Sequence, residues 1–299
     1  MNKPLAKMAI AMVLQTLIAP ASAGTHTSAD TMFKSADSAD VTENFTVAKT
    51  KYLDLISKLR QSDPANPMII RAQTRLARIY IFQRDFDKAE PIFHILMHTA
   101  HRKLDLEPEL MIDLDDLSEA YENLHDDPRH GLESLEHSLA VRKFINPNHP
   151  RVPDSYRSLA EHCVTTSNLK QSIDWISKSI EIEKHYPLKD QSNLVSDQTF
   201  LSIVYLAAND VDRAQQTAHV ALDTVARCAC GKNQLPQLHA NLGRIYSRKG
   251  LFDQADKEYQ LSLQTMPPKD NFAKGWPKYI MRYRQENDSL ARKAKAGHH

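Results

Sequence analysis

Three histidines of the sequence have a spacing that could bind a metal ion. His94, His98 and His101 follow one another at i, i+4 and i+7 in the stretch FHILMHTAHRK, so a helix places them on one face. Two histidines one turn apart on a helix can hold a metal ion together. The glutamate that follows the first histidine in zinc proteases is missing after His94. We therefore expect a solvated outer stripe, and metal binding by these histidines stays an alternative.

The cysteines are the second set of reactive residues. Cys228 and Cys230 are separated by one residue in ARCACGKNQ, and a bond between them would close a strained ring. A structural role, a redox role and metal binding all stay open for this pair. Cys163 lies within an apolar helical pattern and is expected to be a buried small hydrophobe. The histidine stripe and the Cys228 pair define our alternative function, an exported metal- or redox-binding protein.

Other catalytic constellations are absent from the sequence. There is no Gly-rich phosphate loop, no nucleophile elbow and no zinc pattern of paired cysteines. The 38 basic and 37 acidic residues balance, so the net charge gives no bias toward nucleic acid or an anionic membrane. We therefore expect a protein that is not an enzyme, binds no cofactor and has no nucleic-acid partner.

A five-residue phrase repeats along the chain every 41 or 42 residues. Nine or ten residues after each copy stands a small residue, and a further residue of the same face follows one helical turn later, so each repeat is expected to form two packed helices. Chains of this kind bury each unit against its neighbours and form elongated solenoids that present a binding surface. The copies are LARIY (76–80), LSEAY (117–121), LAEHC (159–163), LSIVY (201–205) and LGRIY (242–246).

The residue types at the packing positions resemble a known family. Leu242, Gly243 and Tyr246 of the fifth copy, followed by Ala255 and Tyr259, are similar to the signature of the tetratricopeptide repeat (TPR). The period is longer than the 34 residues of the basic repeat, but the residue types favour TPR over HEAT or armadillo units. The resemblance implies an all-α, right-handed superhelical solenoid of helix-turn-helix units that binds a protein or peptide without catalysis.

The joints between the repeats resemble those of one TPR subgroup. Pro147, His149, Pro150 and Val152 in SLAVRKFINPNHPRV (138–152) match the Pro-x-His-Pro-x-Val turn of kinesin-light-chain-like arrays. A proline cannot continue the incoming helix but suits the start of the next one. Residues 67–269 are therefore expected to form about five TPR units.

The first residues of the chain have the layout of a secretory signal peptide. Lys3 and Lys7 precede an apolar run from Met8 to Ile18, and a small-residue site ends at Ala23. We expect cleavage after Ala23, a periplasmic or extracellular location and no stable membrane insertion afterwards; an uncleaved N-terminal helix is the alternative. The remaining expected segments are a disordered leader (24–40), the helix of an N-terminal half-repeat (41–66), and a capping helix with a basic tail (270–299).

The resemblance also implies where a partner binds. In TPR arrays the first helix of each unit lines the concave groove, and fixed positions around the repeated leucine point into it. We expect reversal of Arg78 and Arg244 to glutamate to weaken partner binding without affecting folding. The predicted groove residues are Arg71, Arg78, Phe82, Asp115, Glu119, Glu122, Asp154, Arg157, Glu161, Asn241, Arg244 and Arg248.

Overall fold

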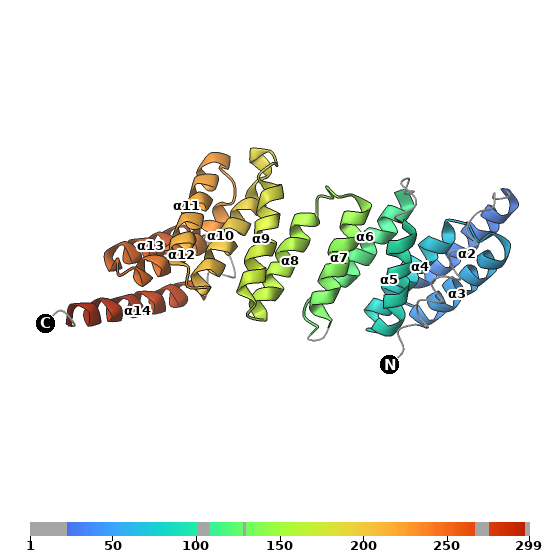
Figure 1. The fold of residues 1–299 in the computed structure, drawn as a ribbon, viewed down its shortest axis with the longest axis horizontal. Helices are drawn as coiled ribbons and strands as arrows, with labels where there is room; N and C mark the ends of the chain where they lie inside the picture. The colour runs from blue at the N-terminus through green and yellow to red at the C-terminus, as the bar shows by residue number, and fades with distance from the viewer. Residues whose placement is uncertain (1–22, 101–107, 128–129, 267–274, 297–299) are drawn as a thin grey trace. The chain divides into compact units, whose positions relative to one another are not determined.

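The computed structural model describes residues 23–100, 108–127, 130–266 and 275–296. Within these residues the regular structure is entirely helical, with thirteen α-helices and two short 3-10 helices joined by turns. The predicted all-α fold of helix-turn-helix units is confirmed (Figure 1). The chain divides into two compact units, residues 1–152 and 153–299. The apolar run of the expected signal peptide lies outside the described residues, and none of the described helices has the length and hydropathy needed to cross a membrane.

Unit 1 consists of three helix hairpins. Within it, the first helix of one hairpin packs on the first helix of the next, and the second helices α5 and α7 also touch. This neighbour-to-neighbour packing is the rule in repeat proteins, since each hairpin buries its apolar face only against the adjacent ones. The pairs are α2 (Ala23–Val41) with α3 (Phe45–Ser62), α4 (Met68–Phe82) with α5 (Phe86–Ala100), and α6 (Pro108–Glu122) with α7 (Gly131–Ile145).

The disordered leader predicted for residues 24–40 is instead helix α2, so this prediction is wrong. The Phe33 ring is buried and lies 5.7 Å from the ring of Tyr52 on α3. Ala36 is also buried, and it stands 41 positions before Ala77, in the same slot of the repeat. The alanines of α2 bury little area each, but they allow close contact between the helix backbones. The expected half-repeat is therefore a complete hairpin.

Unit 2 also contains three hairpins, followed by a last single helix. Two short 3-10 helices, η1 (Leu188–Asp190) and η2 (Lys232–Gln234), lie in the joints between its hairpins. The pairs are α8 (Val152–Thr165) with α9 (Leu169–Glu183), α10 (Ser192–Ala207) with α11 (Val211–Cys228), and α12 (Leu235–Arg248) with α13 (Phe252–Gln264); the last helix is α14 (Trp276–Ala296).

The turn inside most hairpins contains one residue with left-handed backbone. Each of these residues stands between the two helices of its hairpin, and they recur at the spacing of the repeat. A glycine takes this conformation without strain, whereas other residues need the surrounding turn to hold them there. Because Glu43 joins α2 to α3 in this way, the N-terminal hairpin is in register with the others. The residues are Glu43 (φ 57°), Arg84 (57°), Ser167 (61°), Asn209 (62°) and Gly250 (74°).

Small residues let the two helices of a hairpin approach closely. Ser202 on α10 is fully buried and donates a hydrogen bond to the carbonyl oxygen of Ala214 on α11 at 2.6 Å. On α12 the equivalent residue is Gly243, where an added Cβ would lie 2.5 Å from the Tyr259 ring. The TPR positions of the sequence therefore mark the closest helix contacts, as expected for this repeat.

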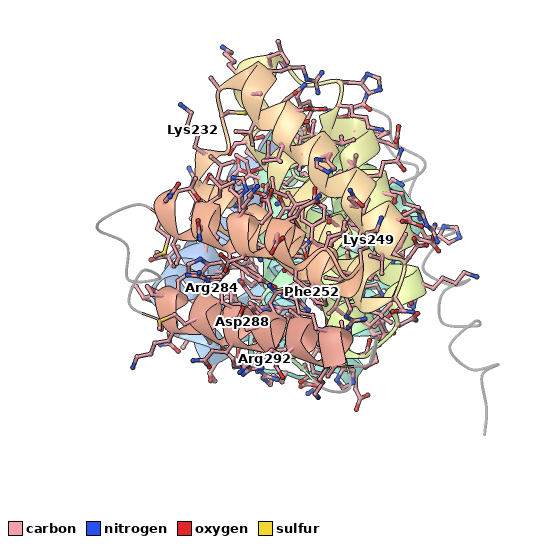
Figure 2. All side chains as sticks on the ribbon, turned by 90° about the vertical axis from the view of Figure 1, so that its left-hand side faces the viewer. Lys232, Lys249, Phe252, Arg284, Asp288 and Arg292 are labelled. Atoms are coloured by element: carbon pink, nitrogen blue, oxygen red, sulfur yellow. A yellow bond between two sulfur atoms is a disulfide. The ribbon has the colours of Figure 1, made fainter. Side chains whose placement is uncertain are left out.

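Helix α14 covers the end of unit 2. Its Arg284 Nε lies 2.6 Å from Asp256 Oδ1 on α13, and the Asn287 side chain donates to the carbonyl oxygen of Phe252 at 3.0 Å. Figure 2 looks onto this end, where Arg284 and Asp288 mark the course of α14 beside Phe252 at the start of α13. The buried Trp276 indole also donates to the Ser262 hydroxyl at 3.0 Å. Helix α14 thus shields the apolar face of the last hairpin, as a solenoid cap does.

Candidate functional site

The arginines of α4 are held by carboxylates of the neighbouring first helices. Arg71 Nε lies 2.7 Å from Asp113 Oδ2 on α6, and Arg78 Nη2 lies 2.6 Å from Asp40 Oδ2 on α2. Between them, Arg75 Nη2 reaches Asp113 Oδ1 at 2.7 Å. The predicted groove arginines Arg71 and Arg78 therefore join adjacent repeats of unit 1 to one another.

These ion pairs are buried, and this changes the expected effect of a charge reversal. The side chains of Asp40 and Asp113 are 0% and 1% exposed. A buried carboxylate that loses its partner keeps its desolvation cost without compensation. Glutamate at position 78 would in addition face Asp40. In place of the expectation that Arg78→Glu leaves folding intact, we therefore expect this variant to destabilise unit 1.

The acidic groove residues of α6 are also paired within unit 1. Glu122 Oε2 accepts a hydrogen bond from Arg142 Nη2 at 2.6 Å, and Arg142 on α7 is completely buried. Arg151 contacts Glu119 Oε1 at 2.9 Å. Asp115 accepts a weaker hydrogen bond from the Ser118 hydroxyl at 3.3 Å. The acidic residues predicted to point into the groove are therefore largely neutralised by contacts inside unit 1.

In unit 2 one arginine forms ion pairs with three carboxylates. Arg157 on α8 contacts Asp197 on α10, and its guanidinium lies 3.0 Å from Asp154 and 3.2 Å from Glu183. Asp197 and Glu183 are 0% and 1% exposed. Burial, followed by the charge of Asp197, raises the pKa of Glu183 to about 8. Two buried carboxylates close to a single guanidinium thus favour keeping a proton on one of them.

This proton gives unit 2 a stability that depends on pH. The native state holds a proton on Glu183 up to about pH 8, whereas the unfolded chain releases it near 4.5. Between these values the native state binds more protons, so the free energy of unfolding falls as pH rises. We expect the urea midpoint, followed by tryptophan fluorescence, to decrease from pH 5 to pH 8, and Glu183→Gln to flatten the curve. Equal slopes for the two proteins would contradict the assignment.

The predicted groove residues of α12 have different environments. Asn241 is 2% exposed, and its Nδ2 donates to the Ser202 hydroxyl at 2.7 Å. Its placement in the groove is wrong, because the side chain fills the contact between α10 and α12. The guanidinium of Arg244 lies 5.3 Å from the Tyr283 ring centroid on α14. Arg248 is exposed and donates to Asn209 Oδ1 at 3.2 Å.

Exposed apolar side chains remain on the first helices of unit 1. Phe82, at the end of α4, is 50% exposed, and Val41, at the end of α2, is 75% exposed. The two residues are 41 positions apart and occupy equivalent places in adjacent repeats. The Phe82 ring stacks on Phe45 at 6.2 Å, and the Arg78 guanidinium lies 5.5 Å from its centroid. We call Val41, Phe45 and Phe82 the apolar edge. Sequence reasoning selected Phe82 and missed Val41, because no helix was expected to end there.

The histidine stripe of α5 contacts groups outside the stripe. His94 Nε2 lies 3.1 Å from Glu90 Oε1, one turn earlier on the same helix. His98 is exposed, and His101 lies outside the described residues. Glu90 also faces α7, where its Oε1 lies 3.5 Å from His137 Nε2. The structure therefore brings His94 close to a second histidine that the stripe does not contain.

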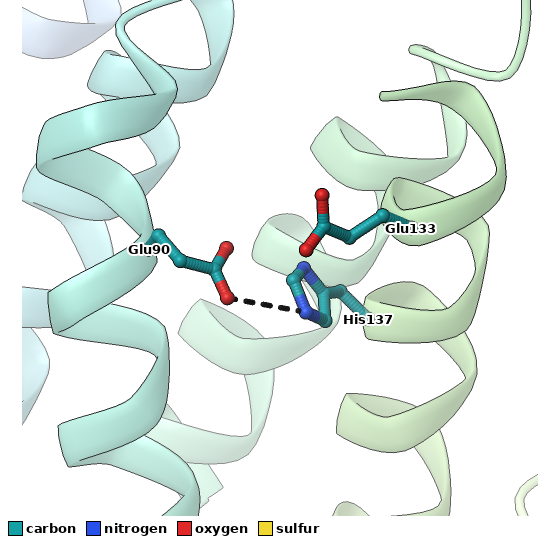
Figure 3. A group of neighbouring side chains, drawn as sticks. All are labelled: Glu90, Glu133 and His137. Carbon is teal, nitrogen blue, oxygen red and sulfur yellow. Dashed lines mark ion pairs between the residues drawn. The ribbon is translucent and has the colours of Figure 1, made fainter. Parts of the chain in front are cut away.

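Three side chains of α5 and α7 converge between these helices. One ligand atom each of Glu90, Glu133 and His137 lies within 4.8 Å of the other two (Figure 3). Burial and His94 lower the pKa of His137 to about 4, so its ring is neutral at neutral pH. We call these three residues the Glu2His cluster. Sequence reasoning missed them, although Glu-x-x-x-His occurs twice, at 90–94 and at 133–137.

Among the residues that the structure describes, two cysteines form a disulfide and a third is buried. Cys228 and Cys230 form a disulfide at the end of α11, around Ala229 with its left-handed backbone. Joined in this way, the two sulfurs offer no thiolate to a metal ion. Cys163 is 1% exposed in the aromatic slot of its repeat, as the sequence predicted.

Comparison with known sequences bears on the repeat assignment. A family model described as tetratricopeptide repeat matches residues 74–107 and 238–271. The chain carries tetratricopeptide repeats. The TPR matches include most of the α4–α5 hairpin and most of the α12–α13 hairpin, and the other described hairpins follow the same spacing. No curated protein is similar enough to be counted as a relative.

Three solved structures are distantly similar to the TPR chain. BtubC (BKLC) from P. vanneervenii is 19% identical, with a TM-score of 0.45 over 77% of this chain and 94% of that one. A putative kinesin light chain from Podosopora anserina with nearly identical TPR-like repeats is 18% identical, with a TM-score of 0.43 over 66% and 93%. The apo form of RapI is 10% identical, with a TM-score of 0.49 over 89% and 77%. At these scores we base the TPR assignment on the family match and the helix pairs.

Proposed function

We propose that this protein is an exported, non-enzymatic scaffold that holds a peptide or helix of a partner protein against the first helices of unit 1. The observation that carries the proposal is the apolar edge, with Phe82 50% exposed and Val41 75% exposed at equivalent positions. Aromatic and aliphatic side chains left exposed together are typical of protein-binding surfaces. TPR arrays are used in general to bind protein partners.

The internal ion pairs define the chemistry of the partner. Since most charges of the first helices are neutralised inside the array, we expect apolar contacts to supply most of the binding energy. An apolar side chain of the partner would pack on Phe82. The Arg78 guanidinium, which lies 5.5 Å from that ring, would donate to a carbonyl or carboxylate oxygen nearby.

The apolar edge can be tested with a matched pair of variants. Phe82→Ser is expected to weaken binding of the partner about thirtyfold, since truncation of a binding hot spot costs about 2 kcal/mol or more. Leu53→Ser is the control, because Leu53 is 48% exposed but lies on the second helix α3. The measurement is affinity capture from the native envelope or medium, followed by quantitative mass spectrometry, with circular dichroism to verify folding. If both variants capture the same partners with equally reduced yield, the proposal is wrong.

Export is tested by the mass of the mature chain. Cleavage after Ala23 is compatible with the fold, since Ala29 is the first buried side chain described on α2. We expect the secreted or periplasmic protein to begin at Gly24. A full-length cytoplasmic protein that retains Met1 would contradict this part of the proposal.

A further inference from the structure

We propose that the Glu2His cluster between α5 and α7 is a binding site for Zn²⁺, with Glu90, Glu133 and His137 as its ligands. These residue types are ligands of zinc, which takes imidazole nitrogen and carboxylate oxygen at about 2.0–2.2 Å. The three ligand atoms already lie within 4.8 Å of one another on two rigid helices (Figure 3). The site is separate from the apolar edge, and it meets the histidine stripe through His94, which contacts Glu90.

The distance between two of the three ligand atoms is close to the value that a tetrahedral ion requires. Two ligands at zinc-bond length on a tetrahedron are about 3.3 Å apart. Glu90 Oε1 and His137 Nε2 are separated by 3.5 Å. Glu133 is exposed, so its side chain is free to rotate, and such a rotation would bring its oxygen from within 4.8 Å toward the same spacing.

The surroundings of His137 fix the direction of its ring. The ring lies 3.8 Å from the Phe93 centroid and 5.1 Å from the Tyr121 centroid, and its side chain is 14% exposed. A ligand held in one orientation by packing loses little entropy when it binds a metal. His94 Nε2, at 3.1 Å from Glu90 Oε1, orients the carboxylate in the way that outer-shell partners do in metal sites.

A buried hydroxyl gives an independent indication of a ligand. Tyr121 is 1% exposed, its hydroxyl makes no hydrogen bond, and it interacts electrostatically with Glu90 and Glu133. A buried polar group without a partner is costly. A zinc ion with three protein ligands carries a water in its fourth position, and this water would accept a hydrogen bond from the Tyr121 hydroxyl. Zinc would thus complete the polar contacts between α5, α6 and α7.

Binding at this place links two successive repeats. Glu90 is on α5, whereas Glu133 and His137 are on α7. A ligand that binds the folded state alone stabilises it by mass action. We therefore expect Zn²⁺ to raise the melting temperature of unit 1, and a chelator to reverse the effect.

The test is Zn²⁺ binding by the purified full chain, measured by competition with a chromogenic chelator. Wild type should bind one equivalent through this site. Glu90→Gln and His137→Gln should each lower the Zn²⁺ affinity at least about 100-fold, because each removes a ligand. His94→Asn removes an outer-shell partner and should lower the affinity about tenfold. The matched controls are His98→Asn on α5 and Glu136→Gln on α7, both exposed, which should leave affinity unchanged.

Further variants and measurements separate the loss of a zinc ligand from a loss of folding. Glu90→Gln and Glu133→Gln keep the shape of the side chain, so they decide the question even where His137→Gln fails to fold. Circular dichroism of each metal-free variant verifies its helix content, and the Zn²⁺-dependent rise in melting temperature should disappear with Glu90→Gln. The proposal is overturned by a wild type that binds no Zn²⁺. Binding that survives Glu90→Gln and Glu133→Gln, or that His98→Asn abolishes, overturns it equally.

Discussion

Replacing Arg157 by alanine is expected to destabilise unit 2 by about 3–5 kcal/mol. Arg157 is the cation next to Asp197 and Glu183, whose side chains are 0% and 1% exposed. Without it, whichever of these two buried groups is ionised loses its counter-charge while its desolvation cost remains. Urea unfolding followed by tryptophan fluorescence measures the effect in this unit, because both tryptophans of the chain, Trp175 and Trp276, belong to it.

A surface arginine of the same unit is the control. Arg213 also forms an ion pair, with Asp210, but its side chain is 61% exposed. Arg213→Ala should therefore leave the urea midpoint close to that of wild type. The loss caused by Arg157→Ala should also be smaller at pH 5 than at pH 8, because protonation relieves the unpaired carboxylates. Similar midpoints for the two variants at pH 8 would show that the cluster does not stabilise the fold.

The repeat period allowed most of the fold to be predicted from the sequence. Leucine, a small residue and an aromatic recur at a fixed spacing, and these residues are where the helices meet. Helix α2 escaped detection because Ala36 and Ala39 occupy the corresponding slots. Alanine favours a helix, but residues 24–40 are mostly small and polar and show no apolar periodicity that would distinguish a packed helix from a mobile segment.

The contacts of the candidate site were harder to predict from the sequence, because they join pairs of residues about one period apart. Arg71 and Asp113 are 42 positions apart, and Arg157 and Asp197 are 40 positions apart. Sequence reasoning treated each charge as directed at a partner and did not ask which charge of the next repeat it would meet. The approach of Glu90 to His137 has the same origin, since it requires knowing that α5 lies against α7.

Replacing Gly243 by alanine is expected to destabilise unit 2 by about 1–3 kcal/mol. Its new Cβ would lie 2.5 Å from Cε1 of Tyr259. The Tyr259 ring has little room to move, because it is 1% exposed and stacks on Tyr283 of α14 at 6.0 Å. Alanine in a helix gains up to about 1 kcal/mol over glycine, and we expect the forced displacement of α13 or α14 to exceed this gain.

A double-mutant cycle distinguishes a steric clash from a change in helix propensity. Gly275→Ala is the control for the substitution itself, since no atom lies within 4 Å of its added Cβ, and it should leave the fluorescence midpoint unchanged. Tyr259→Leu removes the ring, so Gly243→Ala should cost less in that background than in wild type. If the cost of Gly243→Ala is the same with leucine at 259, the close approach of α12 and α13 is not limited by this contact. In that case the TPR glycine serves another purpose than making room for Tyr259.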